Sequence, residues 1–224
     1  MPVHRSSLAD GIACGPHARE VRLLVIPGLH GSGDAHWQSW LQRQYRHSAR
    51  VEQADWSMAD LKRWSERIGH VALQRPAVTW IAVAHSFGCL ALARALREGV
   101  GNLGAAIFVA PADPRRFDID RLLPQVALEV PSAVVASDTD PHMAARQAAD
   151  WALRWGAHFV NLGDAGHINV ESGFGPLPRV KSMVDALACR LKRAQRPRID
   201  EPLDSDDHAA VPDRADAHGG AASA

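Results

Sequence analysis

Three segments of the sequence carry side chains that can act together in acyl transfer. Ser86 lies between an apolar run and a helical pattern, in Ala84-His85-Ser86-Phe87-Gly88. The segments Ser137–Pro141 and Asp164–Asn169 each follow a later apolar run. A serine hydroxyl becomes a strong nucleophile when a histidine takes its proton and a carboxylate orients that histidine. The three segments therefore predict a Ser–Asp–His triad.

The surroundings of Ser86 match the strand, sharp turn and helix of a nucleophile elbow. In the G-x-S-x-G form of this turn, small residues two positions to either side let the strand and the helix approach closely. Gly88 fits the pattern, and Ala84 is one methyl group larger than the commoner glycine. A serine that merely caps a helix is the alternative. The strand on one side and the helix on the other favour the elbow.

His167 is the predicted general base of this triad. Gly166 precedes it and permits a tight loop after a late strand, which would present the imidazole at the edge of the sheet. The order Ser, acid, His along the chain is the one that α/β hydrolases use. His142 is the weaker rival, because it is expected to open a helix.

Two carboxylates, Asp138 and Asp140, follow the strand that precedes His167, and either could be the acid. Asp140 is favoured because Pro141 disfavours helical geometry in the residue before it. A carboxylate in the loop beyond the strand end needs such an extended or turn conformation to reach His167. Asp138 is closer to the strand and is expected to bond neighbouring loop amides. The resemblance described below independently points to the Asp-Pro pair.

A glycine-rich turn, Pro27–Gly33, follows the first apolar run and leads into a helical pattern. The tetrahedral intermediate of acyl transfer needs preorganised hydrogen-bond donors for its oxyanion. In this type of site the residue after the nucleophile supplies one backbone N–H, and the first loop supplies another. We therefore expect the oxyanion donors to be the N–H groups of Phe87 and Leu29.

The same turn could suggest a dinucleotide or a metal site. The glycines between positions 28 and 33 give G-x-x-G-x-G, which differs from the G-x-G-x-x-G fingerprint, although Asp55 lies near the place of a ribose-binding acid. A metal site built from His30 and His36 lacks any spacing such as H-E-x-x-H. These histidines are expected to line the mouth of a cleft, and neither a cofactor nor a metal is expected.

Short apolar runs alternate with amphipathic stretches between residues 20 and 194, which is typical of a parallel sheet with helices on both faces. The predicted strands are Val21–Ile26, Arg50–Ala54, Val78–Ala84, Ala105–Val109, Ala133–Ala136 and His158–Leu162. The predicted helices are Ala35–Tyr45, Ala59–Gln74, Phe87–Glu98, His142–Trp155 and Pro178–Arg193. The result is one α/β-hydrolase domain with a single, mostly parallel sheet of about six strands.

The remaining segments lack the features of further domains. The connection from Pro111 to about Pro131 is too short for a large cap domain but can border a cleft. Residues 1–19 and 195–224 have no periodic apolar pattern and are expected to be disordered. No segment resembles a signal peptide or a membrane helix, so a cytoplasmic protein is expected.

The composition narrows the class of partner. The chain has 25 Lys and Arg against 25 Asp and Glu, so no net charge would attract nucleic acid or an anionic membrane. A small-molecule ester is the expected partner, and the sequence names no protein partner. Cys14, Cys89 and Cys189 form no C-x-x-C pair, which argues against a disulfide framework.

The ordered set of motifs resembles the small serine hydrolases typified by retinoblastoma-binding protein 9 and its bacterial relatives. The resemblance covers about Val21 to Leu191 and rests on Pro27-Gly28, His36-Trp37 with Trp40, Asp55-Trp56, His85-Ser86-x-Gly88, Val109-Ala110-Pro111, Asp140-Pro141 and Gly166-His167. It implies a compact α/β hydrolase without a large cap, a Ser86-Asp140-His167 triad and no cofactor. It supplies no substrate, and without an L-x-C-x-E segment it implies no binding of the retinoblastoma protein.

The predicted function is hydrolysis of a carboxylic ester or a related acyl compound through an acyl-Ser86 intermediate. Two alternatives use the same fold. One is a catalytically silent binding protein, since fold and function separate readily. The other is a lyase or an acyltransferase that uses the same triad.

Overall fold

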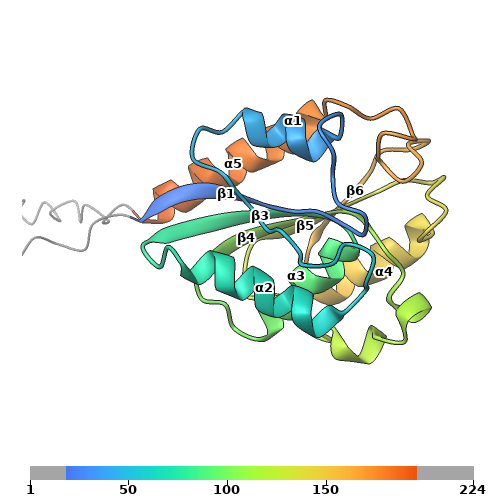
Figure 1. The fold of residues 1–224 in the computed structure, drawn as a ribbon, viewed down its shortest axis with the longest axis horizontal. Helices are drawn as coiled ribbons and strands as arrows, with labels where there is room; N and C mark the ends of the chain where they lie inside the picture. Colours follow the sequence, from blue (N-terminus) through green and yellow to red (C-terminus); the bar gives the residue numbers. More distant parts are fainter. Residues whose placement is uncertain (1–18, 196–224) are drawn as a thin grey trace, which may run out of the picture.

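Six parallel strands form the centre of the structure, a computed structural model that describes residues 19–195 (Figure 1). The sheet has the order β2-β1-β3-β4-β5-β6. Its strands are β1 (Glu20–Ile26), β2 (Ala49–Arg50), β3 (Val78–Ser86), β4 (Leu103–Pro111), β5 (Ser132–Ala136) and β6 (His158–Asn161). The expectations of disorder for residues 1–18 and 196–224 lie outside the described residues.

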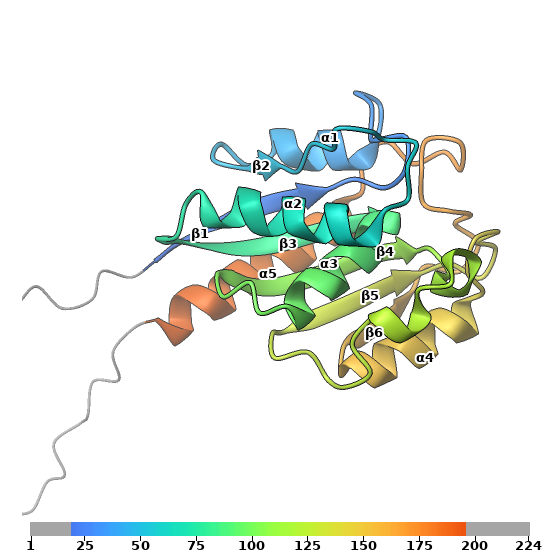
Figure 2. The same ribbon diagram turned by 60° about the horizontal axis from the view of Figure 1, so that its bottom comes forward.

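Helices cover both faces of the sheet (Figures 1 and 2). On one face lie α1 (Trp37–Arg43) and α5 (Pro178–Ala194). The other face carries α2 (Leu61–Leu73), α3 (Phe87–Arg97) and α4 (Ala145–Trp155). Two short 3-10 helices, η1 (Pro114–Phe117) and η2 (Asp120–Leu122), occupy the long connection after β4. The predicted α/β architecture is confirmed, including every predicted strand and helix.

Two of the predicted element boundaries were wrong by three residues or more. The strand expected over Arg50–Ala54 is only Ala49–Arg50, because β2 is an edge strand that pairs with β1 alone before the chain turns away. The helix expected from His142 begins at Ala145. The backbone N–H of His142 instead donates to Asp140 Oδ1 at 2.8 Å, so the side chain of Asp140 holds this segment in a turn.

The sequence of β3 explains its place at the centre of the sheet. Residues from Val78 to His85 are apolar or uncharged and almost all buried, as expected of a parallel strand that is covered on both faces. The strand pairs with β1 from Val78 to Ala84 on one side and with β4 from Trp80 to Ser86 on the other. The residue that follows His85 therefore emerges at the middle of the sheet's carboxyl edge.

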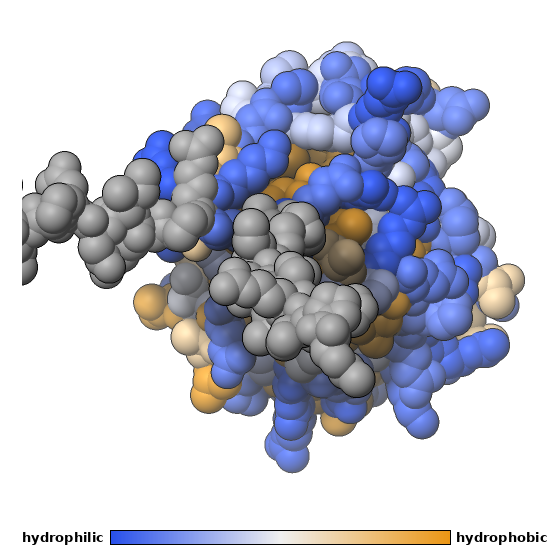
Figure 3. Space-filling view, turned by 90° about the vertical axis from the view of Figure 1, so that its left-hand side faces the viewer, coloured by the Kyte–Doolittle hydropathy of each residue, from blue (hydrophilic) through white to orange (hydrophobic). Residues whose placement is uncertain are grey.

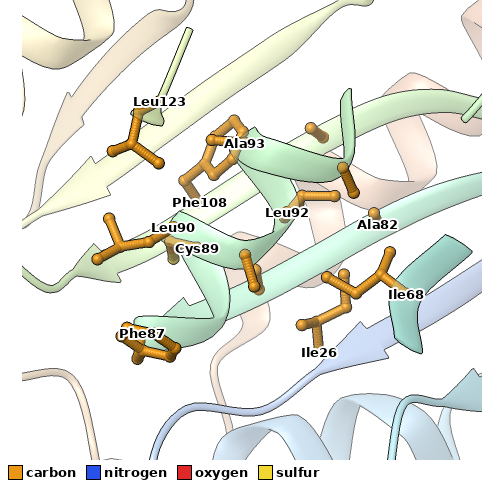
Figure 4. Packing of buried hydrophobic residues seen from close by; sticks show 14 of the residues in the cluster. Ile26, Ile68, Ala82, Phe87, Cys89, Leu90, Leu92, Ala93, Phe108 and Leu123 are labelled. Atoms are coloured by element: carbon orange, nitrogen blue, oxygen red, sulfur yellow. The ribbon is translucent and has the colours of Figure 1, made fainter. Parts of the chain in front are cut away.

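Two apolar clusters hold the layers together. One joins the sheet to α2, α3 and α4, and the other joins it to α1 and α5. In Figure 4, apolar side chains of α3 lie over the sheet beside Ile68 of α2. Trp151 and Trp155 pack with ring centroids 5.2 Å apart, and Trp37 and Trp64 are buried, so these tryptophans belong to the core.

The parallel sheet gives the two ends of the molecule different characters. The amino ends of the strands face the viewer in Figure 3, where hydrophilic side chains surround a partly visible apolar area. The carboxyl ends meet at the opposite edge, and the loops after β1, β3, β4, β5 and β6 converge there. Open α/β sheets bind ligands at this edge.

Gly88 provides a test of how closely α3 approaches β1. A Cβ at this position would collide with the carbonyl oxygen of Pro27 and lie 2.8 Å from that of Ile26. We expect Gly88→Ala to cost about 1–3 kcal/mol of stability, as overpacking does, and to lower the unfolding midpoint by roughly 2–12 °C. Gly101→Ala is the control, because a Cβ there meets only the carbonyl oxygen of Gly99, at 4.0 Å. Equal midpoints for both variants in a thermal melt would contradict the close approach.

Candidate active site

Ser86 occupies a strained turn between β3 and α3. Its φ of 53° and ψ of −125° lie outside the regions that a residue with a side chain prefers. Such conformations cost about 1–3 kcal/mol and persist only where the surroundings fix them. The Ser86 carbonyl accepts from the N–H of Ala112 at 3.3 Å, and a Cβ at Gly28 would lie 2.7 Å from Ser86 Cβ. The turn therefore has the geometry of a nucleophile elbow.

The position two residues before Ser86 tolerates a methyl group. Ala84 is fully buried, pairs with Ile26 of β1 and has no positive φ. Gly88 has no such freedom, because the backbone of β1 fills the space that its side chain would need. Close packing in this elbow therefore requires glycine at position 88, on the helix side, whereas position 84 on the strand side accepts alanine.

His167 joins the nucleophile to a carboxylate. Its Nε2 lies 2.9 Å from Ser86 Oγ, and its Nδ1 lies 3.0 Å from each carboxylate oxygen of Asp140. The side chains of His167 and Asp140 are only 8% and 3% exposed. A carboxylate facing Nδ1 places the ring proton there and leaves Nε2 free to accept from the serine hydroxyl. The structure brings together the three predicted side chains, and their catalytic roles stay a prediction.

The two candidate acids face different partners. Asp138 Oδ1 accepts from Asn161 Nδ2 at 2.7 Å, and the Asp138 N–H donates to the Gly163 carbonyl at 2.8 Å. Asp140 instead faces the ring of His167. Only Asp140 is thus in position to orient the histidine.

Two hydroxyl groups tie the loop of the carboxylate to the loop of the histidine. Ser137 Oγ donates to the Gly163 carbonyl at 3.0 Å. Thr139 Oγ1 donates to Asp164 Oδ1 at 2.7 Å and accepts from the N–H of Gly166 at 2.9 Å. Sequence reasoning did not identify these residues as part of the site. Their position next to the aspartates in Ser137-Asp138-Thr139-Asp140 was the available signal.

His85 lies beneath the site and was also missed. It is 5% exposed, and its Nε2–H donates to the backbone carbonyl of His167 at 3.0 Å. Burial, with smaller contributions from His167 and His36, lowers the pKa of His85 well below its usual range. His85 is therefore neutral and anchors the backbone of His167. Its place directly before Ser86 in the sequence could have suggested this role.

His142 packs against His167 rather than opening a helix. The two ring centroids are 4.3 Å apart, and Arg116 of η1 donates from Nη1 to His142 Nδ1 at 3.1 Å. Burial and the neighbouring His167 lower the pKa of His142. This histidine therefore belongs to the site as a neighbour of His167, but it has no contact with the Ser86 hydroxyl.

The two predicted oxyanion donors belong to the glycine-rich turn and to the elbow itself. Within residues 19–195 the Leu29 N–H donates to no acceptor, whereas the next amide, of His30, donates to the Trp56 carbonyl at 2.9 Å. Phe87 is the first residue of α3, where a backbone N–H has no acceptor within the helix. Both groups are therefore free to bind a ligand oxygen, which is compatible with the predicted role.

A buried amide holds the glycine-rich turn in place. Gln38 donates from Nε2 to the carbonyls of Ile26 and Val83 at 3.0 and 3.2 Å, and its Oε1 accepts from Ser32 Oγ at 2.6 Å. Arg50 Nη1 donates to the Ser32 carbonyl at 2.8 Å. The turn is thereby fixed to the ends of β1 and β3, which keeps the Leu29 amide next to the elbow.

Ser86 and His167 open into a pocket of about 620 Å³. Its walls come from the glycine-rich turn, from η1 and from the loop after His167. His30 and His36 both line it, as predicted for the mouth of a cleft. Asp55 lies elsewhere, exposed, and accepts from the N–H and hydroxyl of Ser57.

Two absences hold for the described part of the chain. No group of three or more His, Cys, Asp or Glu side chains within residues 19–195 is arranged to hold a metal ion. Over the same range, no helix is both long and apolar enough to cross a membrane.

A family model described as serine hydrolase matches residues 23–186. The chain belongs to this serine hydrolase family. The serine hydrolase is 37% identical to a protein from Pectobacterium atrosepticum described as a YdeN-like hydrolase, with a TM-score of 0.73 over 77% of this chain and 92% of that one. It is 21% identical to the YdeN protein of Bacillus subtilis, with a TM-score of 0.62 over 75% and 98% of the two chains.

A more distant structure shares the fold alone. It is esterase 2 of Thermogutta terrifontis with butyrate bound, which is 15% identical, with a TM-score of 0.54 over 80% of this chain and 86% of that one. No curated protein matches the chain. The prediction of a small α/β serine hydrolase is thus confirmed, while the particular resemblance to retinoblastoma-binding protein 9 stays a prediction.

The different contacts of the two aspartates predict different effects of mutation. We expect Asp140→Asn to fold normally and to lower turnover by about 10⁴-fold, as in the serine-protease triad when the acid becomes an amide. Asp138→Asn is the matched control and should lose less than about tenfold, because it keeps an oxygen for Asn161. The measurement is turnover of a soluble ester, with circular dichroism to check folding. A larger loss in Asp138→Asn would transfer the role of acid to that residue.

Proposed function

We propose that this serine hydrolase cleaves esters of carboxylic acids, or related acyl compounds, through an acyl intermediate on Ser86. The observation that carries the proposal is the unbroken set of contacts from Asp140 through His167 to the Ser86 hydroxyl. This set ends in a pocket large enough for a small acyl compound. The free amides of Leu29 and Phe87 beside it support the same chemistry.

In the first half of the proposed reaction, Ser86 Oγ attacks the carbonyl carbon of the ester. His167 Nε2 takes the hydroxyl proton, and Asp140 stabilises the imidazolium that forms. The carbonyl oxygen becomes an oxyanion and accepts from the N–H groups of Leu29 and Phe87. The bond to the leaving oxygen then breaks, and this oxygen takes the proton from His167.

The second half repeats these steps with water as the nucleophile. His167 takes a proton from water, and the resulting hydroxide attacks the carbonyl carbon of the acyl-Ser86 ester. The bond to Ser86 Oγ breaks, and the proton on His167 returns to the serine. The carboxylic acid leaves and the free enzyme is restored.

The pocket favours small substrates that dissolve in water. The connection from Pro111 to Pro131 contains only η1 and η2, which are too short to form a mobile lid over an apolar groove. The Thermogutta esterase binds butyrate on a similar fold, which is consistent with a short acyl group here. We therefore infer that short-chain esters are the preferred class.

Covalent labelling tests the nucleophile. A fluorophosphonate reacts with an activated serine and not merely with the fold. We expect labelling of the wild type and none of Ser86→Ala. Ser182→Ala is the control, since Ser182 lies on the exposed side of α5 and bonds only the Pro178 carbonyl, and it should label fully. Absence of labelling in the wild type would favour a silent binding protein, and labelling without ester hydrolysis would favour an acyltransferase or a lyase.

A series of nitrophenyl esters tests the substrate class. We expect kcat/KM to be highest for acyl chains of about two to six carbons, because the connection after β4 provides no lid to cover a long chain. The rate should follow the dissolved concentration without a jump when the substrate forms an emulsion. Faster turnover of emulsified long-chain esters than of soluble short ones would contradict this preference.

A further inference from the structure

His36 also lines the substrate pocket, yet the reaction described above does not use it. It is the residue immediately before α1, and it follows the glycine-rich turn that carries Leu29. Its Nδ1 accepts from the backbone N–H of Gln38 at 3.1 Å, which caps the amino end of the helix. One nitrogen of the ring thus has a structural role, and the other is free.

The helix cap fixes the position of the ring proton. A nitrogen that accepts a hydrogen bond carries no proton, so in the neutral ring the proton lies on Nε2. Burial, together with the charge of Arg50 and the proximity of His167, lowers the pKa of His36 to about 4. The ring is therefore neutral at physiological pH and presents a permanent N–H donor.

The donor of His36 meets no acceptor in the described part of the protein. The residue is 6% exposed, and its ring packs 5.0 Å from the ring of His85 and 5.3 Å from that of Trp37. Within residues 19–195 its Nε2 bonds no acceptor, yet it is not sealed from solvent. A donor that keeps some access to solvent is met by an acceptor there, either water or an oxygen of a ligand. The accessible side of the residue opens to the pocket of Ser86, so a ligand can supply that acceptor.

We propose that His36 Nε2–H donates a hydrogen bond to an oxygen of the acyl substrate bound at Ser86. The proposal rests on the proposed function and adds a third donor to the two backbone amides. A neutral imidazole suits this role, because it can polarise an oxygen without becoming a competing base, as the neutral histidine of triosephosphate isomerase does. It also sits on a rigid element, since the helix cap and the packing against His85 and Trp37 hold the ring.

Two substitutions separate the cap from the donor. In His36→Asn, the amide oxygen can accept from the Gln38 N–H in place of Nδ1, but the side chain is too short to reach the position of Nε2. In His36→Gln, the amide nitrogen can reach the position of Nε2, but the helix loses its close-range cap. Each variant thus keeps one function of the histidine and removes the other.

The two variants are expected to show opposite effects on activity and on stability. His36→Asn should keep the wild-type unfolding midpoint and lose about 10²-fold in kcat/KM for 4-nitrophenyl butyrate, the size of loss seen when one oxyanion donor is removed. His36→Gln should lower the midpoint by a few degrees and keep activity within about tenfold of wild type. Full activity in His36→Asn, or losses of activity that follow stability in both variants, would overturn the proposal.

A binding measurement decides the role of His36 without depending on turnover. In a Ser86→Ala background, calorimetry with intact 4-nitrophenyl butyrate should show about tenfold weaker binding after His36→Asn, the size expected for one neutral hydrogen bond. Equal affinities would overturn the proposal. If the wild type fails to react with a fluorophosphonate, the proposed function fails, and this binding result still supports or overturns the His36 contact.

Discussion

The strained turn at Ser86 is the constraint on which the rest of the site depends. A φ of 53° at a serine is unfavourable, and it persists because the glycine-rich turn and the backbone of β1 pack directly against the elbow. Gly28 and Gly88 permit this packing, since a side chain at either position would collide with its neighbours. The same close approach places the glycine-rich turn, which carries the predicted donor Leu29, beside the serine at the carboxyl edge of the sheet.

Burial lowers the pKa values of the histidines around His167. His85 and His36 are kept neutral because burial penalises their charged forms, and His142 has its pKa lowered for the same reason. The carboxylate that contacts the His167 ring belongs to Asp140, which is itself 3% exposed at its side chain. A positive charge that forms on His167 during turnover would therefore face an anion on one side and neutral rings on the others. Such surroundings stabilise an imidazolium at the place where the proposed chemistry needs it.

Membership of the serine hydrolase family limits the chemistry more than it limits the substrate. The chain shares its fold with YdeN-like hydrolases, and the connection after β4 holds only two short 3-10 helices. Selectivity must then come from side chains that line the pocket itself, such as His36 on the glycine-rich side and Arg116 on η1. The proposed donor at His36 would make the pocket selective for substrates that carry a suitably placed oxygen.

The sequence by itself determined the fold class, because runs of buried strand alternate with helical patterns, and it singled out Ser86 and His167, because each follows such a strand. A local preference and a family resemblance favoured Asp140 over Asp138, but the contact itself depends on which carboxylate faces a ring 27 positions away. It also placed His142 in a helix, because the periodicity of that segment carries no sign of the turn that the Asp140 side chain stabilises. The roles of His85, Gln38 and the free nitrogen of His36 arise from contacts between separate strands, turns and helices. Only the tertiary structure could decide them, because burial and hydrogen-bond partners exist only after those segments have packed together.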